Sequence, residues 1–325
     1  MSAPSPAALD RGTSSPAGRG FLLVVLAALC WGTSGVSGQL VLDRTDLRPL
    51  DIAWHRMAVG AVVLLAAQVL GRRRRRAGPR VAVTRGTAVR LFLVGAGLGG
   101  YQLAFFAAVG SAGVSIATLV ALGLAPLLIA VGATVLGHGR PDRATVLALV
   151  AALTGLVLLV GVSADAGGTT VVVGALLAVG SALGYAVVTL AGAGVPAGIP
   201  VTVVGFVGGA LLLTPVALAT GLTFTTDPVA LAVLLYLGAV PSALAYRLFF
   251  TGLRTVPGPV ASIVTLLEPL TATALATVFL GERLAPAALA GGLLVLAAVA
   301  GLYLRRMGDS NSRGVAPNPL SKRAP

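Results

Sequence analysis

The segment VASIVTLLEPLTATALATVFL, residues 260–280, decides the fold of this protein. It is long enough to cross a bilayer, which takes about 20 apolar residues, yet Glu268 and Pro269 lie near its centre. An ionised carboxylate at the bilayer midplane costs roughly 2.5–3.5 kcal/mol on insertion scales. Proline cannot donate to the carbonyl of Thr265, so it kinks the helix and frees that carbonyl. Because lipid cannot satisfy the carbonyl, we expect the kink to face protein or a water-filled cavity.

Composition indicates an integral membrane protein. Of its 325 residues, 57% are hydrophobic and 10% are charged, whereas a soluble domain carries about 25% charged residues. The net charge of +13 would suit a nucleic-acid-binding protein, but the densest arginine cluster, residues 72–76, lies between two apolar spans. The positive-inside rule explains such a cluster as a cytoplasmic loop. We therefore expect contact with membrane lipids and no nucleic-acid partner.

Ten apolar spans account for most of the chain, which predicts an all-α integral membrane protein. We place them at 21–41, 50–70, 88–109, 114–136, 144–162, 171–190, 200–219, 228–250, 259–280 and 286–304. The polar tails, residues 1–20 and 305–325, are predicted to be disordered and cytoplasmic. The single cysteine, Cys30, allows no intrachain disulfide, and no cluster of metal ligands is present in the sequence.

Arginine asymmetry orients these spans. With the N-terminus in the cytoplasm, the arginine-rich loop 71–87 and Arg305 lie inside. Loops 163–170, with Asp165, and 220–227 contain no Arg or Lys and fall outside. External arginines have acidic sequence neighbours: Asp43 and Asp46 for Arg44 and Arg48, and Glu282 for Arg283. We predict a multi-pass protein of the cell membrane with both termini cytoplasmic.

The two halves of the chain are similar to each other. Shared features recur at an offset of about 143–145 residues: Phe105-Phe106 and Phe249-Phe250, Pro126 and Pro269, Leu136-Gly137 and Leu280-Gly281, and Pro141 and Pro286. This divides the chain into two repeats, residues 21–162 and 171–304, each of five spans. Because five is odd, the second repeat enters from the opposite side, and the repeats are inverted. Transporters are built this way, with the site near the midplane at the repeat interface.

On these residues the sequence resembles the EamA branch of the drug/metabolite transporter superfamily. The resemblance covers residues 21–304 and rests on the following stretches: Trp31-Gly32-Thr33-Ser34, Arg56, Ala125-Pro126, Leu237-Gly238, Ala243-Leu244-Ala245-Tyr246, Ala261-Ser262, Leu267-Glu268-Pro269 and Leu280-Gly281-Glu282-Arg283-Leu284. The chain departs from the family pattern at Gly137-His138-Gly139, where Gly-Glu is common. The resemblance implies a carrier of small metabolites, often an exporter, that works by alternating access.

Glu268 is the sharpest candidate for a functional residue. Burial favours the protonated form of a carboxyl group, so Glu268 could bind and release a proton during transport. The alternative is a structural acid that pairs with a helix end or a polar neighbour. Pro126 and Pro269 are predicted to interrupt their spans and to serve as hinges.

Arg56 and a group of polar and aromatic residues complete the predicted site. Arg56, next to His55, either attracts an anionic group at the outer mouth or extends to the lipid headgroups, with Trp54 as an interfacial anchor. Arg247, near the inner end of its span, is assigned to the positive-inside pattern. The remaining candidates for a cavity wall are Trp31, Tyr101, Gln102, Tyr185 and Tyr246. Each of them could instead be a packing residue.

These observations predict a secondary active transporter, an exporter of amino acids or drug-like compounds, without a cofactor. Spans one, three, four, six, eight and nine are expected to line the route. A proton is a candidate coupling ion, and a homodimer is compatible with the sequence. The alternatives are a channel or lipid scramblase on the same bundle, and a membrane-embedded enzyme that acts on lipids. The enzyme is disfavoured because the sequence has no phosphate loop, no Gly-x-Ser-x-Gly motif and no metal-ligand cluster.

Overall fold

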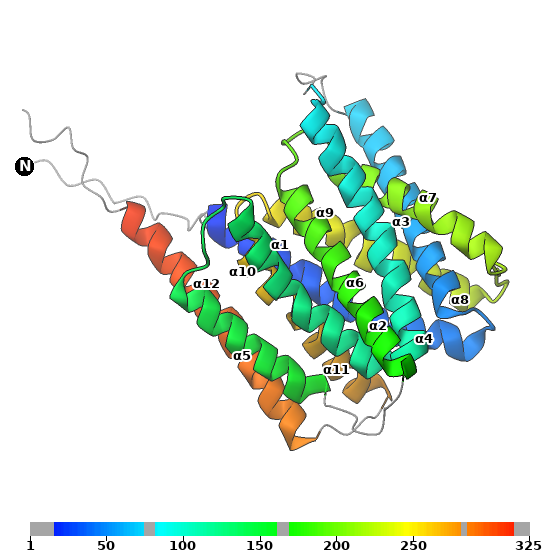
Figure 1. The fold of residues 1–325 in the computed structure, drawn as a ribbon. Helices are drawn as coiled ribbons and strands as arrows, with labels where there is room; N and C mark the ends of the chain where they lie inside the picture. The colour runs from blue at the N-terminus through cyan, green and yellow to red at the C-terminus, as the bar shows by residue number, and fades with distance from the viewer. Residues whose placement is uncertain (1–15, 75–81, 161–168, 281–284, 315–325) are drawn as a thin grey trace, which may run out of the picture.

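The fold is a bundle of helices (Figure 1). The computed structural model describes residues 16–74, 82–160, 169–280 and 285–314, and within these ranges every regular element is a helix. The first half contains α1 (Pro16–Gly32), α2 (Ser34–Arg44), α3 (Pro49–Arg74), α4 (Arg85–Val135) and α5 (Arg143–Val160). The second half contains α6 (Thr169–Ala193), α7 (Val201–Ala219), α8 (Pro228–Leu237), the π-helix η1 (Gly238–Leu244), α9 (Ala245–Gly252), α10 (Gly258–Val264), α11 (Leu267–Leu280) and α12 (Pro286–Gly314).

Ten helical segments in the described ranges are long and apolar enough to cross a membrane, as predicted. They are Gly18–Arg44, Pro49–Gly71, Arg85–Gly113, Ile116–Val135, Arg143–Val160, Thr169–Ala193, Val201–Ala219, Pro228–Gly252, Gly258–Phe279 and Pro286–Arg305. The α12 helix continues to Gly314, into the stretch predicted as a tail. The predictions for Asp165, Gly281, Glu282 and Arg283 concern residues outside the described ranges.

Breaks in four helices shape the bundle. Gly113, with φ +80° and ψ 165°, separates spans three and four within α4, a conformation that glycine adopts most readily. Span one breaks at Thr33, whose hydroxyl donates to the carbonyl of Cys30 at 2.7 Å. Span nine breaks at residues 265–266, between α10 and α11, and span eight contains η1.

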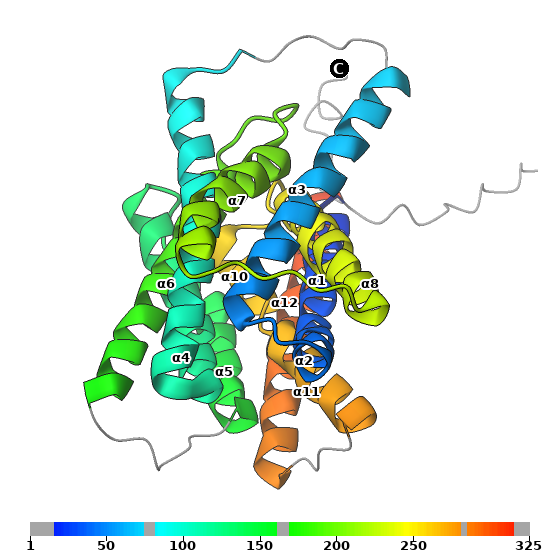
Figure 2. The same cartoon turned by 90° about the vertical axis from the view of Figure 1, so that its right-hand side faces the viewer.

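Close helix contacts depend on small residues. The α4 helix packs along α6, where a Cβ on Gly97 would lie 3.1 Å from the carbonyl oxygen of Gly184. The α5 helix packs along α12, as Figure 1 shows, and a Cβ on Gly291 would lie 2.4 Å from the carbonyl oxygen of Gly155. Glycine therefore allows the backbones of the two repeats to touch. In Figure 2, α3 and α8 stand across the bundle from α4, α5 and α6.

The two described ends of the bundle lie together. The ring of Phe21, near the start of the first span, is 5.3 Å from the ring of Tyr303, near the end of the last span. An even number of spans places both ends on the same side of the membrane, and this ring contact agrees with that.

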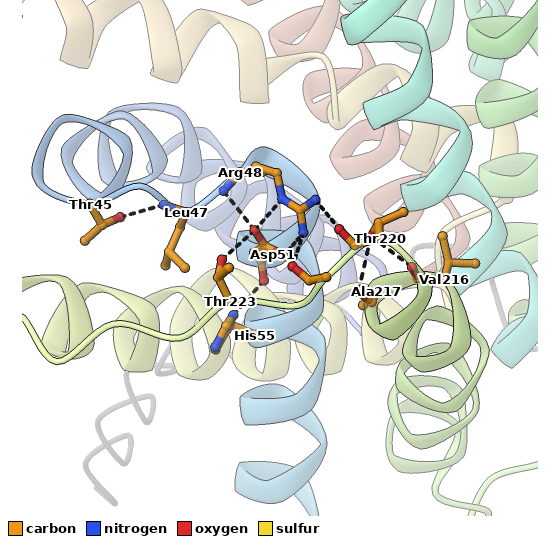
Figure 3. A network of polar contacts seen from close by, with 10 residues as sticks. Thr45, Leu47, Arg48, Asp51, His55, Val216, Ala217, Thr220 and Thr223 are labelled. Atoms are coloured by element: carbon orange, nitrogen blue, oxygen red, sulfur yellow. Dashed lines mark hydrogen bonds and ion pairs between the residues drawn. The ribbon is translucent and has the colours of Figure 1, made fainter.

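An ionic network ties the two repeats together at the other end of the bundle (Figure 3). The carboxylate of Asp51 is fully buried and accepts from the Arg48 guanidinium at 2.8 and 2.9 Å and from the Thr223 hydroxyl at 2.9 Å. Arg48 also donates to the backbone carbonyls of Thr220 and Gly221. Arg44 pairs with Asp227 at 3.2 Å. The ion-pair partners of these arginines are therefore not Asp43 and Asp46, the acidic neighbours in the sequence.

Candidate functional site: a cavity at the repeat interface

A cavity of about 960 Å³ lies between the two repeats. Every residue predicted for a cavity wall lines it: Trp31, Arg56, Tyr101, Gln102, Tyr185, Tyr246 and Glu268. The cavity extends from Glu268 to the ends of spans one, two, five and ten, where Leu42, Pro49, Val160 and Ala285 line it. Whether these side chains contact a substrate remains a prediction, but the tertiary structure brings them all around one space.

Glu268 lies in the first turn of α11, directly after the break in span nine. The backbone N–H of Glu268 donates to the carbonyl of Thr265 at 2.9 Å, so the carbonyl that Pro269 was expected to free is satisfied by a tight turn. The partial positive charge of a helix N-terminus favours a carboxylate at this position. In the described part of the chain, no hydrogen bond or ion pair reaches the carboxylate of Glu268. It therefore lines the cavity without a hydrogen-bonded or ion-paired side chain, although Arg56 is near enough to attract its charge.

Arg56 faces the protein interior and not the lipid headgroups. Its Nε donates to the hydroxyl of Ser242 in η1 at 3.2 Å, and its side chain lines the cavity. The alternative in which Arg56 extends to the headgroups is therefore wrong. Trp54 is likewise held within the protein, since its Nε1 donates to the Thr214 hydroxyl at 3.0 Å.

Aromatic side chains form the deep wall of the cavity. Trp31 packs against Tyr246 with ring centroids 4.9 Å apart and against Tyr185 at 6.5 Å. The hydroxyls of Tyr101 and Tyr246 are hydrogen-bonded to each other, which joins span three to span eight. The Nε1 of Trp31, the hydroxyl of Tyr185 and the Oγ of Ser34 are buried without a hydrogen-bond partner in the described structure. An unsatisfied buried donor costs about 1–3 kcal/mol, so these groups would gain from a polar ligand.

A second cavity of about 780 Å³ lies toward the opposite end of the bundle. It is lined by His138, Arg140, Asp142 and Arg305, among other residues. On α4, Ala125 lines the larger cavity and Ala133 the second one, with the buried Ile129 between them. On span nine, Val260 lines the second cavity and Thr265 the larger one, with the buried Ile263 and Val264 between them. An apolar layer thus divides the two cavities.

The prolines of spans four and nine differ in their effect. Span nine is broken before Pro269, but α4 keeps helical dihedrals through Pro126, and its non-helical residue is Gly113. The predicted interruption of span four at Pro126 is therefore absent. Pro126 is buried, and a membrane helix can stay continuous through a proline when neighbouring helices surround it. A hinge role for Pro126 remains a prediction.

Sequence reasoning missed several residues of the wall. Spans two, five and ten contribute as well as the six expected spans. Ser242 does not line the cavity but accepts from Arg56, which does. It was not considered from the sequence alone, although Pro241-Ser242 within an apolar span indicates that backbone carbonyls there need other donors.

Comparison with known proteins identifies the family of this chain. The model of the EamA-like transporter family matches residues 18–161 and again residues 172–304. The chain belongs to the EamA-like transporter family. It is thus a multi-pass membrane transporter of the drug/metabolite transporter superfamily, and members of this family are generally not enzymes.

Two relatives agree with this assignment. The chain is 31% identical over 286 residues to the "Uncharacterized transporter YwfM" of Bacillus subtilis (strain 168), which covers 85% of this chain and 93% of that protein. A solved structure named only as "Crystal structure of protein" has a TM-score of 0.74 and 24% identity, and it covers 89% of this chain and 98% of that chain. The second likeness supports the fold alone.

Proposed function

We propose that this EamA-like protein is a secondary active exporter of small metabolites, such as amino acids or drug-like compounds, in the cell membrane. The observation that carries the proposal is the cavity between the repeats, which holds an unpaired carboxylate, Glu268, and an arginine, Arg56. Buried charges are costly in a membrane and mark substrate or ion pathways. A site of this kind near the repeat interface is typical of carriers built from inverted repeats.

The apolar layer supports a carrier over a channel. A channel needs one continuous polar path, whereas a carrier exposes its site to one side at a time. The described structure has two cavities separated by buried residues such as Ile129 and Ile263, and only the larger one contains Glu268. We propose that the repeats rock against each other and open the second cavity to the same site.

The arginine distribution gives this state a direction. If the arginine-rich loop 71–87 and the chain ends are cytoplasmic, the larger cavity opens to the outside. The structure would then correspond to the state in which an exporter releases its substrate. A proton is the proposed coupling ion, because Glu268 is the only carboxyl group among the described residues that line the cavity.

A proteoliposome experiment tests the proposal. Purified protein is reconstituted and offered radiolabelled amino acids, nucleosides and cationic drugs, with and without a pH gradient. We expect saturable transport of at least one solute class, with accumulation against its gradient when a pH gradient is imposed. Transport that neither saturates nor accumulates solute would instead indicate a channel, and lipid translocation without solute transport would indicate a scramblase.

A further inference from the structure

Pro241 and Ser242 give span eight an unusual hydrogen-bond pattern. Pro241 has no N–H, so it cannot donate to the carbonyl of Leu237 four residues earlier. The hydroxyl of Ser242 donates to that carbonyl at 2.8 Å. The π-helix η1 spans these residues, and its hydrogen bonds run from a backbone N–H to the carbonyl five residues earlier, which for Ser242 is again that of Leu237. The carbonyl that Pro241 cannot reach is therefore satisfied by Ser242.

This bond fixes the role of the Ser242 hydroxyl toward Arg56. A hydroxyl has one proton to donate, and Ser242 donates it to the carbonyl of Leu237. Ser242 can therefore only accept from the Nε of Arg56, at 3.2 Å. Ser242 and Leu237 are each about 1% exposed, so water does not compete for these positions.

The rest of the Arg56 guanidinium is available to a ligand. Nε is one of its five N–H donors, and in the described structure it is the donor with a protein partner. Arg56 lines the cavity, and no ion pair joins it to Glu268 among the described residues. The planar fork of a guanidinium matches the two oxygens of a carboxylate.

The arrangement is specific to the second repeat. The π-helix η1 lies a few residues before Phe249, whereas α4 has helical dihedrals over the residues that precede Phe105.

We propose that Ser242 is a positioning residue that aims the Arg56 guanidinium into the cavity, where Arg56 binds the carboxylate group of the transported solute. This inference rests on the proposed transport function and narrows its substrate class to carboxylate-bearing metabolites. Pro241 contributes by leaving the carbonyl of Leu237 open to the serine.

The transport test uses L-phenylalanine and phenethylamine, which differ by the carboxylate alone. The variants are Ser242→Ala, Ser242→Thr and Arg56→Gln, with Ser262→Ala as the matched control. Ser262 is also about 1% exposed and donates to a backbone carbonyl, that of Pro259 at 2.8 Å, but Arg56 donates to Ser242 and not to Ser262 in the described structure. We expect Ser242→Ala to raise the KM for phenylalanine about tenfold, as for loss of a charge-assisted hydrogen bond, and to leave phenethylamine unchanged. Arg56→Gln loses phenylalanine transport, Ser242→Thr restores it, and Ser262→Ala changes neither solute.

A second measurement is independent of transport. In protein with 15N-labelled arginine, the Nε–H signal of Arg56 is assigned by its loss in Arg56→Lys. We expect slow exchange of this proton with water in the wild type and Ser242→Thr, and fast exchange in Ser242→Ala and Pro241→Ala. An unchanged exchange rate in Ser242→Ala would overturn the positioning role.

The two measurements separate the inference from the proposed function. Transport of phenethylamine without phenylalanine, or an equal KM change for both solutes in Ser242→Ala, would refute the carboxylate assignment and leave transport intact. Transport of neither solute by the wild type would also refute this assignment. The proposed function itself fails only if the broader solute screen fails, and the exchange rates judge the positioning role in every case.

Discussion

Spans four and nine occupy equivalent places in the two repeats and carry equivalent prolines, yet only span nine is broken. In span nine, the hydroxyl of Thr265 donates to the carbonyl of Ser262 at 2.8 Å, and the N–H of Leu266 donates to Ile263 at 3.1 Å. Span four has Leu122 and Gly123 at the corresponding positions, which offer no side-chain donor. Local side-chain bonds compete with the helix. The comparison shows that a proline breaks a membrane helix when its neighbours supply the turn.

The same asymmetry extends to the charges. Glu268 precedes the proline in the second repeat, and Ala125 precedes it in the first. The cavity therefore has its carboxylate on one repeat and its arginine, Arg56, on the other. The two similar repeats therefore contribute side chains of opposite charge to the same cavity.

The largest expected effect concerns this carboxylate. We expect Glu268→Gln to lower transport at least about tenfold, because glutamine keeps the shape of the side chain but cannot bind and release a proton. Membrane abundance is expected to change less than about twofold. Transport and abundance are measured in the same proteoliposomes. Equal transport per molecule in both proteins would make Glu268 a structural acid, and the difference between the repeats would then be one of packing.

The next prediction concerns the ionic network around Asp51 that joins the two repeats. Asp51→Ala removes a buried carboxylate that accepts from Arg48 and Thr223, and we expect a clear fall in the unfolding temperature because these hydrogen bonds are lost. The exposed pair is the control: Arg44→Ala is expected to lower the unfolding temperature less. Thermal unfolding in detergent measures both. Equal losses would show that burial of Asp51 does not set the strength of the tie.

Gly32 tests how closely span one crosses the broken span. A Cβ at Gly32 would lie 2.4 Å from the Cβ of Thr271 and 2.8 Å from the carbonyl oxygen of Glu268. We expect Gly32→Ala to destabilise the protein by about 1–3 kcal/mol through overpacking. Gly35→Ala is the matched control, since its nearest neighbour would be 3.9 Å away. Similar unfolding temperatures for the two variants would contradict the tight crossing.

Replacing each proline by alanine tests the comparison directly. Pro269→Ala allows the helix to continue through the break, and we expect a several-fold loss of transport with little loss of abundance. Pro126→Ala adds a donor to a helix that is already continuous, so its effect is expected to be smaller. Transport assays on both variants decide the matter. Equal losses would support the paired hinges that the sequence predicts.

The smallest effect is expected at acidic pH. The Arg44 guanidinium that donates to Asp227 lowers the pKa of that carboxyl. A lowered pKa in the folded state stabilises the fold above the unfolded pKa, and this contribution is lost as the pH falls below about 4. The stability of the wild type should therefore fall in this range slightly more than that of Asp227→Asn. Identical pH profiles would exclude a contribution from this pair.

Much of the fold was predictable because the bilayer imposes simple rules. Hydrophobic span length predicted ten spans, with small errors at their ends. The repeated Phe-Phe and Pro positions predicted two repeats, and arginine asymmetry predicted their orientation. The site residues were recognisable one by one, since Trp31, Glu268 and Arg56 are unusual within apolar spans. The contacts that hold them in place were not predictable, because a pair such as Arg56 and Ser242 joins residues 186 positions apart.

The sequence by itself determined the number of spans and the relation between the two halves, because hydrophobic length and local periodicity are properties of single segments. Tertiary structure alone decided which proline breaks its helix and which partner each arginine takes. Those outcomes depend on competing hydrogen-bond acceptors that come from distant segments, and their positions exist only after the helices have packed.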